Sequence, residues 1–116
     1  MTMMHDALFV YGSLLAEAKR SEILGHRVEV MEARVDGFER RRGRYFYIVR
    51  AAGASTAGLI MRNLSQADWR RLDIYEEVPT LYTREEVEVT TSAGILRCWV
   101  YLPTRELVQT CADVSK

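Results

Sequence analysis

The sequence predicts an α+β protein in which a small mixed, mainly antiparallel sheet or partly closed β-barrel carries flanking helices. Three observations lead to this fold class. About six short segments are rich in β-branched and aromatic residues, and short connections join them. Only two or three segments can be helices, and they do not alternate with the strands as in a doubly wound fold. A chain of 116 residues can bury one core, so we expect one domain over residues 1–116, with its core in residues 7–103.

The chain begins with a strand, a turn and a helix. Residues 7–11 (ALFVY) form a short apolar run that is typical of a buried strand. Gly12 and Ser13 interrupt this run. Residues 14–24 can then form a short helix that ends at Gly25.

The middle of the chain contains three further β-prone segments. Residues 28–35 hold three valines and indicate a strand. Residues 38–44 hold four arginines and predict an exposed loop. Strands are expected at residues 45–49 (YFYIV) and 56–61 (TAGLIM), with a turn of small residues at 51–55 between them.

The last part of the chain predicts a capped helix and a hairpin. Ser65 and Asp68 form a Ser-x-x-Asp pattern, in which the two residues satisfy free amides at a helix start. After Pro79, alternating valines and glutamates at 86–89 indicate a half-buried strand. A turn at 92–94 leads to residues 95–102, which are apolar on both faces and therefore typical of a central strand. The tail, residues 104–116, could form a short helix or fray.

Charge, cysteine content and hydropathy exclude several classes of protein. Acidic and basic residues number 16 each, and this balance argues against nucleic-acid and membrane-surface binding. The chain shows no signal peptide and no apolar run near the roughly 18 residues that span a bilayer, so we expect a cytoplasmic protein. Cys98 and Cys111 match no zinc or redox motif, and neither His5 nor His26 has metal-ligand spacing with them. We therefore expect reduced thiols and no metal.

The strongest candidate for chemistry is a carboxylate near the end of the helix that Ser65 begins. At about 100° per residue, Glu76 lies on the same side as Trp69 and Leu72, which define the buried side. Apolar surroundings raise the pKa of a carboxyl group, which can then exchange protons near neutral pH. Glu77 should face solvent more freely. In the alternative, Glu76 and Asp73 only form structural ion pairs with arginines. The candidates for those pairs are Arg70, Arg71 and Arg84.

The second candidate is the turn Tyr11-Gly12-Ser13-Leu14. Glycine lets the backbone approach a ligand closely, and free amides at a helix start attract carboxylates and oxyanions. The alternative is an ordinary strand-to-helix turn in which Ser13 is the N-cap.

Two weaker candidates remain. Ser13, His26 and Asp73 contain the groups of a catalytic triad, but a triad is defined by geometry rather than by sequence order. The cluster Arg40, Arg41, Arg42 and Arg44 is typical of a solvated segment in a chain of zero net charge. If this cluster has a function, it selects an acidic substrate.

Three blocks of the sequence resemble the γ-glutamylcyclotransferase-like family. LFVYGSLL (8–15) resembles its N-terminal strand and loop, LDIYEEVPTLYTREEVEV (72–89) its second block, and CWVYLP (98–103) its third. The blocks occur in the family's order and spacing. The resemblance implies a small mixed β-barrel with flanking helices, no cofactor, and an intramolecular reaction that releases 5-oxoproline and an amine from a γ-glutamyl amide.

Residue by residue, the resemblance implies Glu76 as the catalytic glutamate and general acid/base. It implies a substrate-holding loop and two tyrosines that line the site. These residues are Tyr11, Gly12, Ser13, Leu14, Tyr82 and Tyr101. Arg84 matches the second block without an implied role. The family often has glycine after the catalytic glutamate, where this chain has Glu77.

The implied partner is a small γ-glutamyl amine or peptide. Two alternatives stay open. The chain could be a non-catalytic ligand-binding or interaction module on the same fold, or it could remove a γ-glutamyl group from a larger biosynthetic intermediate.

Overall fold

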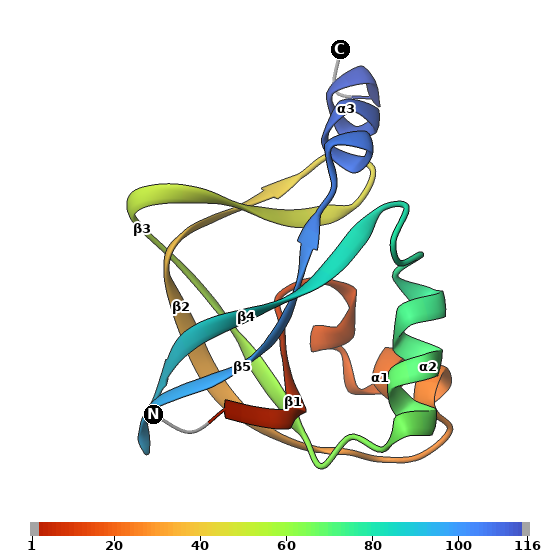
Figure 1. The fold of residues 1–116 in the computed structure, drawn as a ribbon, viewed down its shortest axis with the longest axis vertical. Coiled ribbons are helices and arrows are strands. Elements are labelled where there is room, and N and C mark those ends of the chain that lie inside the picture. Colours follow the sequence, from red (N-terminus) through yellow and green to blue (C-terminus); the bar gives the residue numbers. More distant parts are fainter. Residues whose placement is uncertain (1–2, 115–116) are drawn as a thin grey trace.

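Five strands curl into a small barrel in the computed structural model, which describes residues 3–114 (Figure 1). The strands are β1 (Met3–Val10), β2 (Glu29–Arg42), β3 (Phe46–Arg62), β4 (Tyr82–Thr91) and β5 (Gly94–Pro103). Their order is β1-β3-β2-β4-β5. Only β1 and β5 run parallel among these described strands. The predicted α+β class and the mixed, mainly antiparallel barrel are confirmed.

The barrel is only loosely closed. β2 and β4 complete it, and over the described residues their register consists of the single pair Arg34 and Thr90. β5 pairs with β1 on one side and β4 on the other, which confirms the central strand predicted from its two apolar faces.

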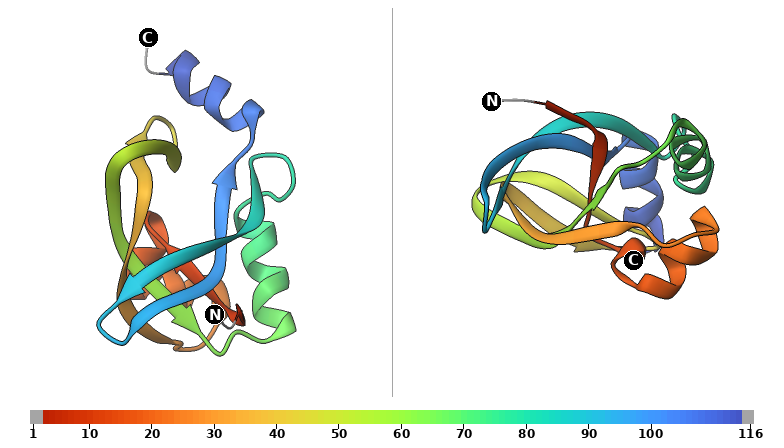
Figure 2. Two further views of the ribbon diagram at one scale, coloured as in Figure 1. Left: turned by 60° about the vertical axis from the view of Figure 1, so that its left-hand side comes forward. Right: turned by 90° about the horizontal axis from the view of Figure 1, so that it is seen from below.

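Three helices flank the strands. A 3-10 turn (Ser13–Leu15) precedes α1 (Glu17–Leu24), and the other helices are α2 (Gln66–Tyr75) and α3 (Arg105–Val114). α1 and α2 pack together beside the barrel, whereas α3 extends from β5 at the opposite end of the molecule (Figures 1 and 2). Because the backbone of Ala16 is extended, the helix predicted over 14–24 is divided in two. The helical alternative for the tail is confirmed. Cys111 lies outside the residues whose side chains are described.

Strands β2 and β3 are much longer than the sequence predicted. Residues 38–44 are not a loop, because β2 continues to Arg42 and only 43–45 turn the chain. Residues 51–55 are not a turn, because they belong to β3, so the barrel has five strands instead of about six. The pairing register of β2 with β3 shifts between Asp36 and Phe38. The small residues at 51–55 therefore form an irregularity within this pair of strands instead of a turn. The partner strand overrides the local propensity of the arginines and small residues.

Two apolar clusters hold the molecule together. One fills the barrel and takes residues from all five strands, including Phe9, Ile48 and Val100. The other lies between the strands and the helices and includes Leu8 and Leu72. β1 contributes to both clusters, which confirms the predicted buried strand. Cys98 is a buried free thiol in the barrel, where burial raises its pKa to about 12.

The start of α2 is fixed by the predicted capping box. Ser65 Oγ accepts a hydrogen bond from the Asp68 amide at 3.1 Å, and the Ser65 amide donates to Asp68 Oδ2 at 3.0 Å. Asp68 is buried and also bonds His26 Nε2 at 2.7 Å, which ties α2 to the segment before β2. Within residues 3–114, no helix has the length and apolar character needed to cross a membrane.

Candidate active site

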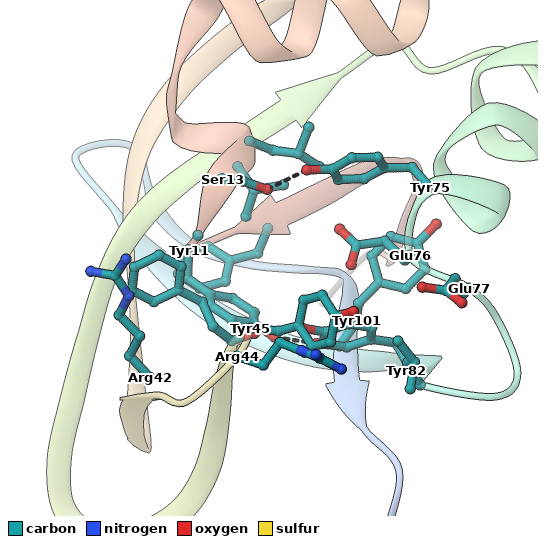
Figure 3. A pocket seen from close by; sticks show the side chains of 16 residues that line it. Tyr11, Ser13, Arg42, Arg44, Tyr45, Tyr75, Glu76, Glu77, Tyr82 and Tyr101 are labelled. Carbon is teal, nitrogen blue, oxygen red and sulfur yellow. Dashed lines mark hydrogen bonds between the residues drawn. The ribbon is translucent and has the colours of Figure 1, made fainter. Parts of the chain in front are cut away.

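A cavity of about 320 Å³ lies where three parts of the chain meet: the turn after β1, the end of α2 and the turn between β2 and β3 (Figure 3). Sequence analysis assigned seven residues to a site, and all seven line this cavity. They are Tyr11, Gly12, Ser13, Leu14, Glu76, Tyr82 and Tyr101. The fold therefore brings together two candidate regions that are separated by about 60 residues of sequence.

Glu76 is the C-cap residue of α2 and directly follows its last residue, Tyr75. Its amide donates to the Leu72 carbonyl at 2.9 Å, which places the side chain one turn beyond the buried Leu72, on the same side of the helix. Glu76 is partly buried, and this burial raises its pKa to about 7. Glu76 has no salt bridge among the described residues, so the structural ion-pair alternative does not apply to it.

That alternative does apply to Asp73. Arg84 Nη2 lies 3.3 Å from Asp73 Oδ2, and the guanidinium of Arg84 is 4.5 Å from the centre of the Trp69 ring. The Tyr101 hydroxyl donates to Asp73 Oδ1 at 2.6 Å. Burial and then this hydrogen bond raise the pKa of Tyr101 far above its usual value, so the hydroxyl stays protonated. Asp73 therefore orients one of the tyrosines that line the cavity.

Gly12 allows close packing at the turn after β1. A Cβ added at this position would lie 2.9 Å from the Cβ of Phe46, so a larger residue would push the turn and β3 apart. Arg40 Nη1 donates to the Tyr11 carbonyl at 3.0 Å, and the Tyr11 hydroxyl donates to the Tyr101 carbonyl at 2.7 Å. The turn is thus fixed on both sides.

Ser13 does not cap a helix. The 3-10 turn that it begins has no side-chain cap, and Ser13 Oγ instead lies 2.7 Å from the Tyr75 hydroxyl oxygen (Figure 3). This hydrogen bond links the turn after β1 directly to the last residue of α2. The N-cap interpretation of Ser13 was wrong because the serine points to α2 rather than back to its own backbone.

Glu77 occupies an unusual backbone conformation. Its φ is 54°, in the left-handed region that favours glycine. The chain thus adopts, with a glutamate, a conformation for which glycine is the usual residue. Glu77 is exposed, as predicted, but it also lines the cavity, so the expectation that it diverges from Glu76 holds only in part.

The triad hypothesis is wrong. His26 bonds Asp68, while Ser13 bonds Tyr75 and Asp73 bonds Tyr101, so the three proposed members have separate partners. Among residues 3–109, whose side chains the structure describes, no group of three or more His, Cys, Asp or Glu residues is placed to hold a metal ion.

Sequence analysis missed several residues of the cavity. Arg42, Arg44, Tyr45 and Tyr75 also line it. The only signal for the arginines was their clustering, which indicated an acidic ligand without indicating a place. Tyr75 was detectable only as the residue before Glu76.

Solved structures with the same fold define a class of small α+β barrel proteins. The chain is similar to an Arabidopsis thaliana protein solved in solution, with a TM-score of 0.78 and 22% identity over 91% of this chain and 73% of that one. It is similar to a structure described as a gamma-glutamyl cyclotransferase, with a TM-score of 0.78 and 22% identity over 85% of this chain and 66% of that one. An AIG2-like protein from Mus musculus has a TM-score of 0.69 and 20% identity over 95% of this chain and 84% of that one. At these identities the likeness shows the fold.

The family itself is shown by sequence. The family model described as "Gamma-glutamyl cyclotransferase, AIG2-like" matches residues 8–115. The chain therefore belongs to this family, as the three sequence blocks predicted. No curated protein matches the chain significantly.

Proposed function

We propose that this protein is a γ-glutamyl cyclotransferase that uses Glu76 as its general acid/base. The observation that carries the proposal is the state of Glu76, a partly buried carboxyl group with a pKa of about 7 on the wall of a cavity. Near neutral pH such a group is present in both protonation states, so it can accept a proton and return it. Family membership supports the same reaction class.

The reaction needs little from the protein besides position and proton transfer. The free α-amine of the γ-glutamyl group attacks its own γ-carbonyl carbon, and a C–N bond closes a five-membered ring. Glu76 accepts one proton from the attacking nitrogen and donates it to the departing nitrogen as the original amide C–N bond breaks. The products are 5-oxoproline and an amine, and the carboxyl returns to its starting state. Because both reacting groups belong to one flexible substrate, holding the bent conformer supplies much of the acceleration.

The turn after β1 is proposed to hold the negative charge of the substrate or of the transition state. The Leu15 amide is used within the turn, because it donates to the Gly12 carbonyl at 3.0 Å. The backbone amides of Ser13 and Leu14 lie at the start of the 3-10 turn, beside the cavity. Amides at such a start suit a carboxylate or a developing oxyanion. Tyr82 and Tyr101 are proposed to pack against the glutamyl chain.

The geometry favours a small substrate. A volume of about 320 Å³ lies at the lower end of the usual range for ligand pockets, roughly 300–1,000 Å³. This favours a small γ-glutamyl amine or peptide over a large biosynthetic intermediate. An ion-paired Glu76 without a cavity beside it would favour the non-catalytic module. In this structure Glu76 lines a cavity and forms no ion pair among the described residues.

Incubation with a panel of γ-glutamyl amines and peptides, including one large conjugate, tests the proposal. We expect 5-oxoproline and the free amine to accumulate in equal amounts from the small members. Release of glutamate would indicate hydrolysis instead. Saturable binding of panel members without any 5-oxoproline would favour the binding module.

A further inference from the structure

Three tyrosine hydroxyl groups around the cavity donate their protons to acceptors within the fold. Tyr11 donates to the Tyr101 carbonyl at 2.7 Å, and Tyr82 donates to the Phe46 carbonyl. Tyr101 donates to Asp73 Oδ1 at 2.6 Å. Carbonyl and carboxylate oxygens have no proton to offer, so tyrosine is the donor in each of these bonds. The single hydroxyl proton of each tyrosine is therefore already used within the protein.

Two of these three acceptors belong to the backbone, and the third is the side chain of Asp73. This carboxylate is held in place from the side of the barrel, because Arg84 Nη2 lies 3.3 Å from Asp73 Oδ2. The guanidinium of Arg84 lies 4.5 Å from the centre of the Trp69 ring and 5.7 Å from that of Trp99. One oxygen of Asp73 thus contacts a fixed cation, while the other accepts the proton of Tyr101.

Glu76 lines the same cavity as Tyr101, and within the described part of the chain its carboxyl group has no hydrogen-bond partner (Figure 3). The pKa of Tyr101 is raised by burial first, then by Asp73, and also by the charge of Glu76. The Tyr101 hydroxyl therefore lies within electrostatic reach of Glu76. A hydrogen bond donated to a carboxylate lowers its pKa, so a Tyr101 proton turned to Glu76 would make Glu76 a weaker base.

We propose that Asp73 is a positioning residue for the acid/base: it holds the Tyr101 proton and thereby keeps this hydrogen-bond donor away from Glu76. Asp73 is not among the residues that line the cavity, so it acts through Tyr101 and not on the substrate. Glu76 then stays a carboxyl group that burial alone tunes. The meaning of this arrangement for catalysis rests on the proposed function, whereas the direction of the Tyr101 proton is a property of the protein by itself.

Other charged or titratable groups also face Glu76 or Tyr101. They come from the turn after β1, from the residue after Glu76, from β4 and from the turn between β2 and β3: Tyr11, Glu77, Tyr82, Arg84, Arg42 and Arg44. All of them are kept in variants at positions 73 and 101. Replacing Asp73 also removes a negative charge, which by itself lowers the pKa of Glu76. A tyrosine variant separates this charge effect from the effect of the released proton.

NMR titration of the Glu76 side-chain carboxyl carbon, in the parent, D73A, Y101F and D73A/Y101F, provides the test. We expect D73A to lower the midpoint by about one pH unit or more, because the released Tyr101 hydroxyl donates to Glu76. In the Y101F background there is no proton to release, so the same substitution should have less than half this effect. D73S, whose side chain is too short to reach the hydroxyl, takes the place of D73A if the alanine variant does not fold.

R84Q is the matched control. It breaks the salt bridge to Asp73 but leaves Asp73 able to accept from Tyr101, so it should not lower the midpoint. In the activity assay, kcat/KM of D73A against pH should move to lower pH by the same amount, and kcat should fall by about threefold because Glu76 is a weaker base. A variant damaged only in its fold would lose rate without a change in the midpoint.

An equal effect of D73A with and without the Tyr101 hydroxyl, or no effect in either background, overturns the inference. Failure of the proposed function is seen differently, as no release of 5-oxoproline by the parent. The NMR titration does not depend on turnover, so it decides the inference in that case too.

Discussion

At the scale of the single residue, burial determines what Glu76 can do. The side chain lies one turn beyond Leu72 on the buried side of α2, so water is partly removed from its carboxyl group. This desolvation raises the pKa of Glu76 to about 7. Asp73, three residues earlier, has partners within the fold: it forms a salt bridge with Arg84 and accepts a hydrogen bond from Tyr101. Two carboxylates on one helix thus have separate roles, one structural and one available to a ligand.

The raised pKa of Glu76 predicts a pH-dependent stability. A carboxyl group whose pKa is higher in the folded state than in the unfolded state lowers the free energy of unfolding as the pH rises. For Glu76 this loss begins near its pKa in the unfolded chain, about 4.5, and is complete above its pKa in the folded protein, about 7. Glu76→Gln should therefore raise the free energy of unfolding at pH 8 by about 1–3 kcal/mol, and this gain should disappear below about pH 4. Urea unfolding across this pH range measures it.

A second glutamine variant serves as the control for stability. Glu32 is exposed on β2 outside the cavity, and Glu32→Gln should stay within about 0.5 kcal/mol of the parent at every pH. If Glu76→Gln were no more stable than the parent at pH 8, the burial argument would be wrong.

Sequence reasoning located Glu76 and the Gly12 turn, but it did not locate the arginines. The side that Glu76 occupies follows from helical periodicity relative to Trp69 and Leu72, which is a local property. The positions of Arg42 and Arg44 depend on where β2 ends and how it pairs with β3. That register is set by contacts between residues far apart in sequence.

At the scale of the element, α2 positions the candidate site. The capping box at Ser65 fixes its first turn, and the hydrogen bond between Ser13 and Tyr75 connects its last residue to the turn after β1. Directly after the C-cap residue Glu76, the left-handed residue Glu77 redirects the chain. The Ser-x-x-Asp pattern made the start of this helix predictable. The signal for a left-handed residue at position 77 was indirect, because the family often has glycine there and this chain has glutamate.

The conformation of Glu77 predicts a stabilising substitution. Glutamate at a φ of 54° carries backbone strain that glycine relieves. We expect Glu77→Gly to raise the free energy of unfolding by up to about 1 kcal/mol. Glycine removes the strain of the left-handed conformation, but it also increases the conformational entropy of the unfolded chain, which offsets part of the gain. Thermal and urea unfolding measure the change.

Glu77→Ala separates the backbone effect from the loss of the carboxylate. Alanine removes the charge but keeps the strain, so it should not reproduce the gain. If the alanine and glycine variants are equally stable, the left-handed conformation carries no strain and the prediction is wrong.

At the scale of the whole molecule, the pairing of β1 with β3 places the turn after β1 beside the cavity. β1 and β3 pack closely near Gly58, where an added Cβ would lie 2.2 Å from the Val10 carbonyl oxygen. Val10 is the last residue of β1 and leads directly into the Tyr11–Leu14 turn. The fold class was predictable from the number and spacing of β-prone segments. The single-pair closure between β2 and β4 was not, because nothing in one sequence specifies which edges meet.

Gly58 therefore tests the close approach of β1 and β3. Gly58→Ala should lower the free energy of unfolding by about 2 kcal/mol or more, because a methyl group cannot fit beside the Val10 carbonyl without moving a strand. Denaturant unfolding measures the loss. Ala57→Ser, at the exposed neighbouring position, should change stability by less than about 0.5 kcal/mol. Equal effects of the two substitutions would contradict the close contact.

The most direct test of the central proposal is the rate of 5-oxoproline release by Glu76→Gln beside the parent protein. Glutamine keeps the shape of the side chain but cannot relay a proton, so kcat should fall by at least about 10²-fold. Ligand binding and the circular dichroism spectrum should remain close to those of the parent, and Glu32→Gln should retain full activity. For the parent, kcat/KM should rise with pH through about 7 as Glu76 loses its proton. Undiminished release of 5-oxoproline by Glu76→Gln would show that another group performs the proton transfer and would contradict the proposal.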